Sequence, residues 1–284
     1  MVLLNPGNNL RLLFSNTDKG IKAFSNLSSF FNHKSLKKRK DIIKAQLDSK
    51  KFQEFKKTGF YHIKNRDFDK INELIISLKK IKLDKTNSKK KFLISNQIYS
   101  SDKIFKLIRT LILNENFFLP LVNYFEHVPV LNMMALWHSP NKKYEKGRSQ
   151  DFHLDCEDTK QIKVFIALDK ITLKSGPMNI ITANESERIM NYFNRNTLGY
   201  VNSKKISDSE IFKHINKSKV KTLVAEKGDI LMVDTSRCYH YGSRPGTVPR
   251  NLLFLQFLSL SSNKIPIKFG QEPYKCVESM LFLH

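Results

Sequence analysis

Residues 150–155 place an imidazole and a carboxylate two positions apart, at His153 and Asp155. Because side chains i and i+2 of an extended chain point to the same side, one strand or strand end can direct both groups into one cavity. A third ligand must come from elsewhere, and His240, 85 residues after Asp155, is the best candidate. Two histidines and one carboxylate on one face of iron(II) leave adjacent positions open, as in non-haem oxygenases. We therefore predict a catalytic metal site formed by His153, Asp155 and His240.

Arg250 follows His240 by 10 residues, across a turn rich in Gly and Pro. An apolar strand is expected directly after it, at 252–260, so the hairpin would bring Arg250 back beside His240. A buried arginine needs an anionic partner, and a guanidinium matches a carboxylate through two hydrogen bonds. The distal carboxylate of 2-oxoglutarate would supply that partner, while its 2-oxo acid end and dioxygen would fill the open positions on iron(II). Ser243, in the same turn, is either a second donor to 2-oxoglutarate or only a turn residue.

The elements that must position these groups are predicted from the spacing of apolar residues. From residue 129 the chain has the turn signals and apolar runs of strands, at 130–138, 162–169, 178–182, 220–225, 230–234 and 252–260. Earlier apolar residues recur at helical spacing, at 38–57, 67–81, 101–113 and 116–126. Gly59 is placed to end the first helix, and 60–63 reads as a short strand. Helices followed by several short strands predict a mainly β fold, a jelly-roll, cupin-like barrel with a helical coat.

Domain organisation follows from the same pattern. Residues 1–35 are rich in Asn, Ser and Phe without clear periodicity, and we expect an N-terminal arm or irregular cap there. Residues 36–284 are expected to form a single domain, with the helical coat at about 36–128 and the jelly-roll core at about 129–262. A Lys-rich loop is expected at 82–91, and a polar, helical insert at 185–215.

Composition narrows the class of protein. A chain of 284 residues with 40% hydrophobic residues has ample material for a packed core, which excludes wholesale disorder. No apolar run approaches the roughly 18 residues that span a bilayer, and the first residues lack the features of a signal peptide. The cysteines Cys156, Cys238 and Cys276 form neither a CxxC pair nor a disulfide framework, which favours a reducing cytoplasm and argues against a structural zinc site.

The formal net charge of +23 has two explanations. It can reflect attraction to an anionic partner, such as nucleic acid, a membrane surface or an acidic substrate. It can also be compositional, because Lys is abundant together with Asn, Ile and Phe and is spread along the chain. The short Lys clusters are not interleaved with aromatic residues, so we expect no nucleic-acid partner. The expected partner is a small-molecule substrate, and the oligomeric state stays open.

Several segments of the chain are similar to one enzyme family. They are 52–60, a helix ending in Gly-Phe; 152–155, the metal motif; 166–169 and 176–178, a strand and turn; and 226–240, the approach to a distal histidine. In these segments the sequence resembles the phytanoyl-CoA dioxygenase-like family of iron(II)- and 2-oxoglutarate-dependent oxygenases. The resemblance implies a double-stranded β-helix fold, iron(II), 2-oxoglutarate and dioxygen, with Arg250 as the residue that binds 2-oxoglutarate.

The resemblance also implies details of the site. In this family the strand before the metal motif often helps to hold 2-oxoglutarate, so His138 or Ser139 can serve here, or be a wall residue. Halogenating relatives lack the carboxylate ligand, so Asp155 implies hydroxylation of an unactivated C–H bond, with release of succinate and CO2. One departure lies at 182–186, where the usual histidine after the Gly-Pro turn is missing. It leaves the metal ligands intact and puts the local substrate contacts in doubt.

Two other functions stay open. A cupin-like metalloprotein that needs no 2-oxoglutarate would have the same fold but no evident use for Arg250. The chain could also be a basic protein that binds nucleic acid or a membrane surface. In that case the histidines would have no role in binding, and the affinity would fall steeply as the salt concentration rises. Asp151, Glu157 and Asp158 crowd the metal motif, either as a second acid cluster or as solvated loop carboxylates.

Overall fold

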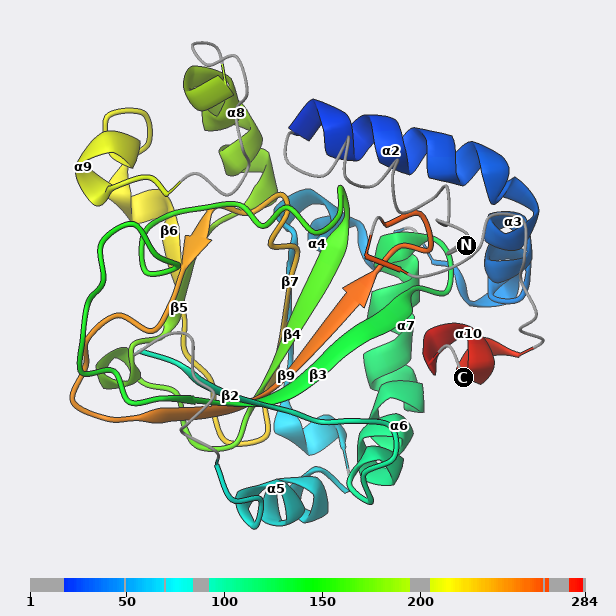
Figure 1. Cartoon of the computed structure of the whole chain (residues 1–284), viewed down its shortest axis with the longest axis horizontal. Helices are drawn as coiled ribbons and strands as arrows, with labels where there is room; N and C mark the ends of the chain where they lie inside the picture. Colours follow the sequence, from blue (N-terminus) through cyan, green and yellow to red (C-terminus); the bar gives the residue numbers. More distant parts are fainter. Residues whose placement is uncertain are drawn as a thin grey trace, which may run out of the picture.

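Two antiparallel sheets face each other in the computed structural model, which describes residues 18–48, 50–68, 70–83, 92–194, 205–262, 264–265 and 276–282 (Figure 1). In this part of the chain the larger sheet has six strands in the order β1-β7-β4-β9-β3-β2, and the smaller has three in the order β6-β5-β8. The strands are β1 Phe60–Ile63, β2 Ile94–Gln97, β3 Val130–Ser139, β4 Gln161–Ala167, β5 Met178–Ile181, β6 Val220–Leu223, β7 Ile230–Val233, β8 His240–Tyr241 and β9 Arg250–Leu258.

Helices cover the outer face of the larger sheet, which gives the predicted barrel with a helical coat. In Figure 1 α6, α7 and α10 lie beside β3 and β9, on the side away from the smaller sheet. The helices are α2 Asp18–Phe31, α3 His33–Asp41, α4 Gln53–Thr58, α5 Ile71–Lys79, α6 Phe105–Leu113, α7 Glu115–Phe125, α8 Ala183–Asn194, α9 Asp208–Ile211 and α10 Val277–Phe282.

Strand β9 shows how the sheet divides its two faces. It lies between β4 and β3, and its side chains alternate between the faces. Leu253, Leu255 and Phe257 pack into the main core with the helices, whereas Leu252 and Phe254 belong to a second cluster inside the barrel. Burying each large apolar side chain contributes about 1.5–3 kcal/mol. Because both faces are covered, the strand is apolar along most of its length, and the inner face is left to form a site.

The single helix predicted at 38–57 is wrong. The segment contains the end of α3, a short 3-10 helix at Lys44–Gln46, and α4. Asp48 interrupts it: its Oδ1 accepts hydrogen bonds from the backbone N–H groups of Lys50 and Lys51, at 3.1 and 3.0 Å. Such an aspartate turn competes with helix formation. Gly59 ends α4 as predicted, in the left-handed conformation with φ of 70°.

The part of the expected N-terminal arm that the structure describes is helical, not irregular. Residues 1–17 lie outside the described residues, and Asp18–Phe31 form α2. Its buried positions Ile21, Phe24 and Ser28 recur at helical spacing, but the polar Ser28 hides the pattern in the sequence. The insert is helical where it is described, in α8 and α9, and most of the expected Lys-rich loop, 84–91, lies outside the described residues. The division into an arm and a single domain stays a prediction.

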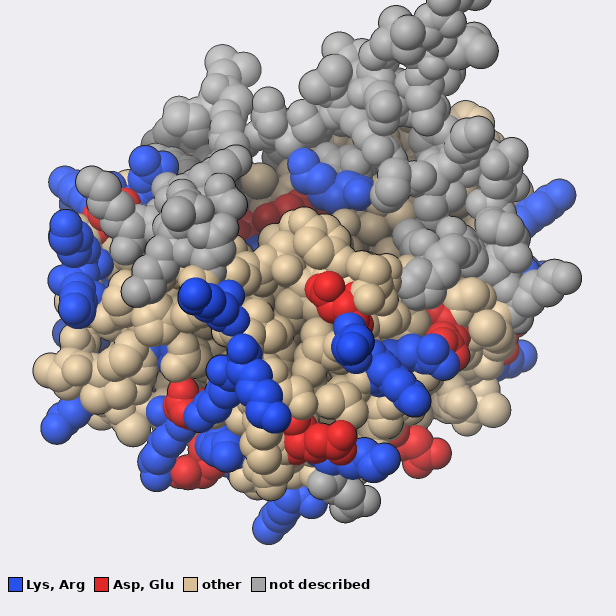
Figure 2. Space-filling view, turned by 60° about the horizontal axis from the view of Figure 1, so that its bottom comes forward, with Lys and Arg blue, Asp and Glu red and all other residues tan. Residues whose placement is uncertain are grey.

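The surface carries scattered charge. On the face seen in Figure 2, Lys and Arg side chains lie among uncharged residues, with Asp and Glu between them. Some are paired, as Lys56 is with Glu126 at 2.7 Å. The described residues of this face form no continuous basic stripe of the kind that follows a nucleic-acid backbone. Among the described residues, no helix has the length and hydropathy needed to cross a membrane.

Candidate active site

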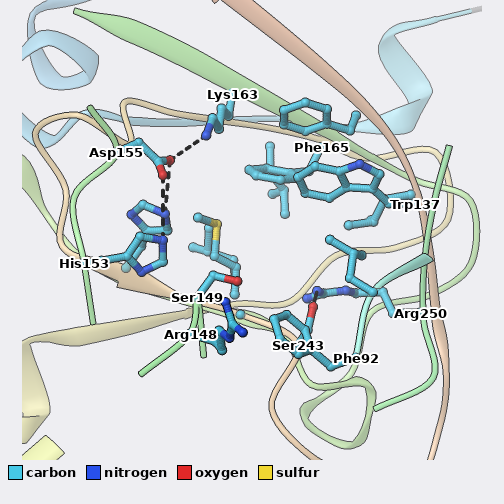
Figure 3. A pocket seen from close by; sticks show the side chains of 18 of the residues that line it. Phe92, Trp137, Arg148, Ser149, His153, Asp155, Lys163, Phe165, Ser243 and Arg250 are labelled. Carbon is cyan, nitrogen blue, oxygen red and sulfur yellow. Dashed lines mark hydrogen bonds and ion pairs between the residues drawn. The ribbon is translucent and has the colours of Figure 1, made fainter. Parts of the chain in front are cut away.

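The inner face of the larger sheet and neighbouring loops line a cavity of about 420 Å³ (Figure 3). Alternate residues of β9 form one wall, from Arg250 through Leu252 and Phe254 to Gln256, because only every second side chain faces inward. Trp137 of β3 stacks on Phe254, with 3.9 Å between the ring centroids. The cavity therefore has an apolar middle, where water is disfavoured, and polar groups toward its ends.

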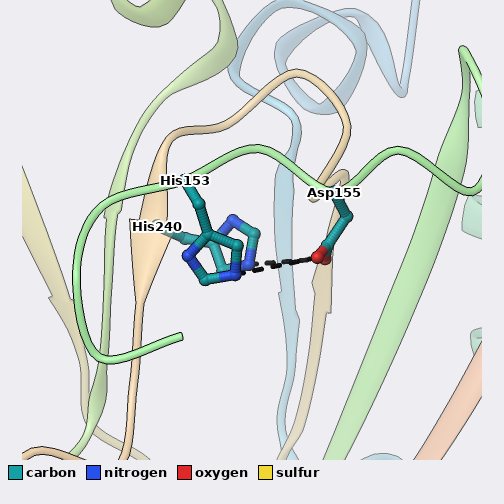
Figure 4. Close-up of side chains that lie close together, drawn as sticks. All are labelled: His153, Asp155 and His240. Atoms are coloured by element: carbon teal, nitrogen blue, oxygen red, sulfur yellow. Dashed lines mark ion pairs between the residues drawn. The ribbon is translucent and has the colours of Figure 1, made fainter. Parts of the chain in front are cut away.

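His153, Asp155 and His240 lie together at this cavity (Figure 4). An antiparallel bridge joins the backbones of the two histidines, with both N–H···O distances at 3.0 Å. This pairing places the imidazoles close together, with 4.2 Å between ring centroids. The backbone N–H of Asp155 donates to the carbonyl oxygen of Thr235, 2.8 Å away. Backbone hydrogen bonds therefore hold the metal motif at both His153 and Asp155. The imidazole of His153 and the carboxylate of Asp155 point toward the same place in the cavity.

The candidate ligand atoms are close enough to share one ion. Nε2 of His153 lies 3.7 Å from Oδ1 of Asp155, and Nε2 of His240 lies 3.4 Å from Oδ2. One ligand atom from each of the three residues lies within 4.8 Å of the others, and no other His, Cys, Asp or Glu cluster in the described ranges has such spacing. Side chains that bind one divalent ion at about 2.1 Å have their ligand atoms at comparable separations.

The remaining ring nitrogens determine which nitrogen faces the ion. Nδ1 of His153 lies 2.8 Å from the carbonyl oxygen of Asp151, and Nδ1 of His240 lies 2.9 Å from that of Cys238. A carbonyl oxygen only accepts hydrogen bonds, so each Nδ1 carries the hydrogen and each Nε2 presents a lone pair. Metal-binding histidines are usually oriented in this way. Two imidazole nitrogens and one carboxylate, with further positions open, fit iron(II).

The protonation states of the site also suit a metal. Burial and the neighbouring His240 hold the pKa of His153 well below its usual value, so the ring stays neutral. Burial alone would raise the pKa of Asp155, but the positive charge of Lys163 acts most strongly in the opposite direction, and the pKa lies well below its usual value. Neutral imidazole and ionised carboxylate are the forms that bind metal ions.

Lys163 is a charged neighbour of the site that the sequence analysis did not find. It lies on β4, and its Nζ donates to Oδ2 of Asp155 at 2.7 Å and lies 3.5 Å from Oε1 of Glu157 (Figure 3). Burial lowers the pKa of Lys163, but the two carboxylates outweigh burial and raise the pKa overall. The residue therefore stays charged. The signal in the sequence was a lysine inside an otherwise apolar run, because buried lysines are rare unless paired.

Asp151 and Asp158, two other acidic residues near the metal motif, accept hydrogen bonds from the backbone of nearby loops. Asp151 and Asp158 are only 3% and 2% exposed, so the expectation of solvated loop carboxylates is wrong for both. Asp151 accepts a hydrogen bond from the backbone N–H of Gly147 at 2.7 Å, and Asp158 accepts one from Ser259 at 2.8 Å. Neither joins the three candidate ligands.

Arg250 begins β9 and is buried in the same cavity. Its guanidinium donates to the carbonyl oxygen of Gly176 at 2.7 Å and to Oγ of Ser243 at 2.8 Å. Within the described part of the chain, Nε of Arg250 has no hydrogen-bond partner and its guanidinium pairs with no carboxylate. Burial lowers the pKa of Arg250 to about 10, which leaves it charged at neutral pH. A buried cation with a free donor is incomplete without an anion.

His138 and Ser139, the two residues of β3 that were expected to help hold 2-oxoglutarate, lie in different surroundings. His138 does not line the cavity; its Nδ1 pairs with the side-chain oxygen of Asn251, at 2.7 Å. It lies on the opposite face of β3 from Trp137, because neighbouring side chains alternate. Ser139 is buried behind Ser243, with 2.9 Å between the two hydroxyl oxygens. Of the expected co-substrate residues, the cavity therefore contains Arg250 and Ser243.

No family model matches the sequence, and no curated protein is significantly similar to it. Solved structures do match the fold. EctD from S. alaskensis, with 2-oxoglutarate and 5-hydroxyectoine, has a TM-score of 0.53 at 11% identity over 84% of each chain. HygX from Streptomyces hygroscopicus, with nickel and 2-oxoglutarate bound, has a TM-score of 0.50 at 14% identity, over 75% of this chain and 88% of its own. The epimerase SnoN, in complex with Fe3+, alpha ketoglutarate and nogalamycin RO, has a TM-score of 0.50 at 10% identity, over 75% and 85%.

At such low identity these likenesses show the fold alone. The chain has the double-stranded β-helix fold of iron- and 2-oxoglutarate-dependent enzymes. The predicted fold class is confirmed, and the resemblance to phytanoyl-CoA dioxygenase-like enzymes is confirmed at the level of the fold.

Proposed function

We propose that the protein is an iron(II)- and 2-oxoglutarate-dependent oxygenase that hydroxylates an unactivated C–H bond of a small organic substrate. Succinate and CO2 would be released. The observation that carries the proposal is one cavity that contains both the His153–Asp155–His240 cluster and a buried Arg250 without a carboxylate partner among the described residues. The cluster suits the metal, and the arginine suits the far carboxylate of the co-substrate.

Each part of the cavity has a separate task in this function. His153, Asp155 and His240 would hold iron(II), while Arg250 and Ser243 would hold the distal carboxylate of 2-oxoglutarate. Bound iron, 2-oxoglutarate and dioxygen together supply the oxidising chemistry that breaks the C–H bond. The stacked rings of Trp137 and Phe254 would keep water out of the part of the cavity between the metal cluster and Arg250.

Two features distinguish the proposed hydroxylase from other functions of the same fold: the buried Arg250 and the mass of the product. A metalloprotein of the same fold that uses no 2-oxoglutarate would leave the buried Arg250 without its anion, so the proposal favours the co-substrate. The carboxylate ligand Asp155 argues against halogenation. Because the epimerase SnoN shares the fold, the choice between hydroxylation and isomerisation rests on the product formed. A product heavier by one oxygen atom supports hydroxylation, and one of unchanged mass supports isomerisation. A cytoplasmic location stays a prediction.

The test of the proposal is iron-dependent turnover of 2-oxoglutarate. The purified chain is reconstituted with iron(II) without oxygen, mixed with 2-oxoglutarate and air, and assayed for succinate. We expect succinate from the natural protein and its loss in His153→Ala and Asp155→Ala. His33→Ala is the matched control, because His33 is exposed and lies outside the cluster. Undiminished succinate from the ligand variants would refute the function.

A further inference from the structure

A tightly held loop precedes the metal motif. The side chain of Gln150, itself fully buried, donates to the carbonyl oxygen of Lys143 at 2.8 Å and accepts from the backbone N–H of Glu145 at 2.6 Å. Asp151 accepts from the N–H of Gly147. Loops fastened by their own buried side chains present their other residues in a fixed direction. Residues 143–151 are thus a fixed part of the site.

This loop brings Arg148 and Ser149 to the cavity. Both line it, and Figure 3 shows them between the metal cluster and Ser243. The N–H of Gly242, two residues after His240, donates to the carbonyl oxygen of Ser149 at 3.3 Å, which joins the loop to the segment that follows the distal histidine. The side chain of Arg148 is exposed, so it lies where the cavity opens.

Arg148, unlike the nearby Arg244, forms no ion pair with an acid among the described residues. Arg244 forms two hydrogen bonds with Asp208, at 2.8 and 2.6 Å. No carboxylate of the described residues pairs with Arg148. An exposed guanidinium that lines a cavity and has no carboxylate partner among the described residues is suited to binding an acidic group of a ligand.

A second cation stands on the other side of the metal motif. Lys205 lines the cavity. Its neighbour Ile206 forms an antiparallel bridge with Phe152, with N–H···O distances of 3.0 and 2.8 Å. Because Phe152 directly precedes His153, this bridge places Lys205 beside the metal ligands. Arg148 and Lys205 thus approach the same cavity from different segments.

The charged side chains that line the cavity are mostly cationic. The described ones are four cations and two carboxylates: Arg148, Lys163, Lys205 and Arg250, with Asp155 and Glu157. The two carboxylates lie beside Lys163, and neither forms an ion pair with Arg148. In the proposed function the distal carboxylate of 2-oxoglutarate binds Arg250, so the guanidinium of Arg148 is available to an acidic group of the substrate.

We propose that the primary substrate is an organic acid, a carboxylate or a phosphate monoester on an apolar carbon segment, whose acidic group binds Arg148 and Lys205. The proposal rests on the function proposed above. The apolar segment would lie against the inner residues Met133, Phe165 and Leu231, which also line the cavity. Two cations for one acidic group give the charge-assisted hydrogen bonds that hold an anion near a protein surface.

Calorimetric titration of the metal-loaded protein with matched acids and neutral analogues tests this. The pairs are hexanoate and hexanamide, phenylacetate and phenylacetamide, and hexyl phosphate and hexanol. At least one acid should bind tenfold or more tightly than its neutral partner, and comparison of hexanoate with hexyl phosphate identifies the acid. Arg148→Gln should weaken that acid about tenfold or more and leave 2-oxoglutarate binding unchanged. Lys146→Gln, an exposed lysine of the same loop outside the cavity, should bind as the natural protein does.

The outcomes separate this proposal from the proposed function. Equal binding of acids and neutral analogues, binding of neither, or an unchanged affinity in Arg148→Gln would overturn the acidic substrate. Whether 2-oxoglutarate produces a visible absorption band on the iron-loaded protein is measured first, without any substrate. If the band appears and acids show no preference, the function stands and the substrate class falls. If acids bind through Arg148 and no band appears, the substrate class stands and the function falls.

Discussion

Nζ of Lys163 donates a hydrogen bond of 2.7 Å to Oδ2 of Asp155, the same oxygen that lies 3.4 Å from Nε2 of His240. The ammonium group thereby fixes the orientation of the carboxylate toward both imidazoles. It also competes for one carboxylate oxygen, which favours binding of a metal through the other. A charge-assisted hydrogen bond of this kind contributes about 1.5–3 kcal/mol.

Replacing Lys163 by methionine tests its role as a positioning residue. The change keeps the length of the side chain and removes the donor, so Asp155 loses its fixed orientation. We expect metal affinity or succinate formation to fall about 10–100-fold, as for other groups that hold metal ligands. Affinity is measured by titration with cobalt(II), independently of turnover. Lys163→Arg keeps the charge and should recover part of the loss, and equal behaviour of Met variant and natural protein would show that Lys163 is only structural.

Replacing Arg250 by alanine should weaken the binding of 2-oxoglutarate specifically. The loss of a two-donor contact with a carboxylate corresponds to about tenfold or more in affinity. The measurement is the concentration of 2-oxoglutarate that gives half-maximal succinate formation, compared with the cobalt(II) affinity, which should stay unchanged. Arg188→Ala, a change of an exposed arginine on α8, is the control. If Arg250→Ala requires no more 2-oxoglutarate than the natural protein, Arg250 does not bind it.

Substitutions at two glycines with left-handed backbones distinguish the cost of backbone strain from the cost of a steric clash. A Cβ at Gly59 would lie 2.7 Å from Sγ of the buried Cys238, whereas a Cβ at Gly147 would meet nothing within 4 Å, and both have φ above 60°. Gly147→Ala should lower the free energy of unfolding by about 1 kcal/mol. Gly59→Ala should lower it by about 2–4 kcal/mol, because overpacking is added. Denaturant unfolding measures both, and equal losses would show that the core around Cys238 yields to the methyl group.

Two of the three candidate metal ligands could be predicted together because they are close in the sequence. His153 and Asp155 are two residues apart, so their spacing alone indicates that the two groups meet. The predicted hairpin of His240 and Arg250 is wrong, because β8 pairs with β5 in the smaller sheet and β9 pairs with β3 and β4 in the larger one. Both side chains still line the same cavity. Lys163 could not be placed in the same way, because its contact with Asp155 depends on the register of β4 against its neighbours. The prediction that His138 could hold 2-oxoglutarate was wrong for a related reason. A shift of one residue moves a strand's side chain to the other face, and the sequence does not specify which face of β3 lines the cavity.

The broken helix after residue 38 shows a second limit. Its apolar residues have helical spacing, but the backbone N–H of Asp48 donates to the side chain of Asn123, at 2.6 Å. That contact joins segments 75 residues apart, and no local pattern contains it. The strands β4 and β9, by contrast, were found because burial on both faces makes them almost continuously apolar.

Anaerobic titration of the purified chain with iron(II) and then 2-oxoglutarate tests the central claim most directly. We expect one iron per chain, a weak visible absorption band that appears only when 2-oxoglutarate is added, and loss of both in His153→Ala. A chain that binds no iron at that ratio, or binds it without any response to 2-oxoglutarate, would contradict the proposed site.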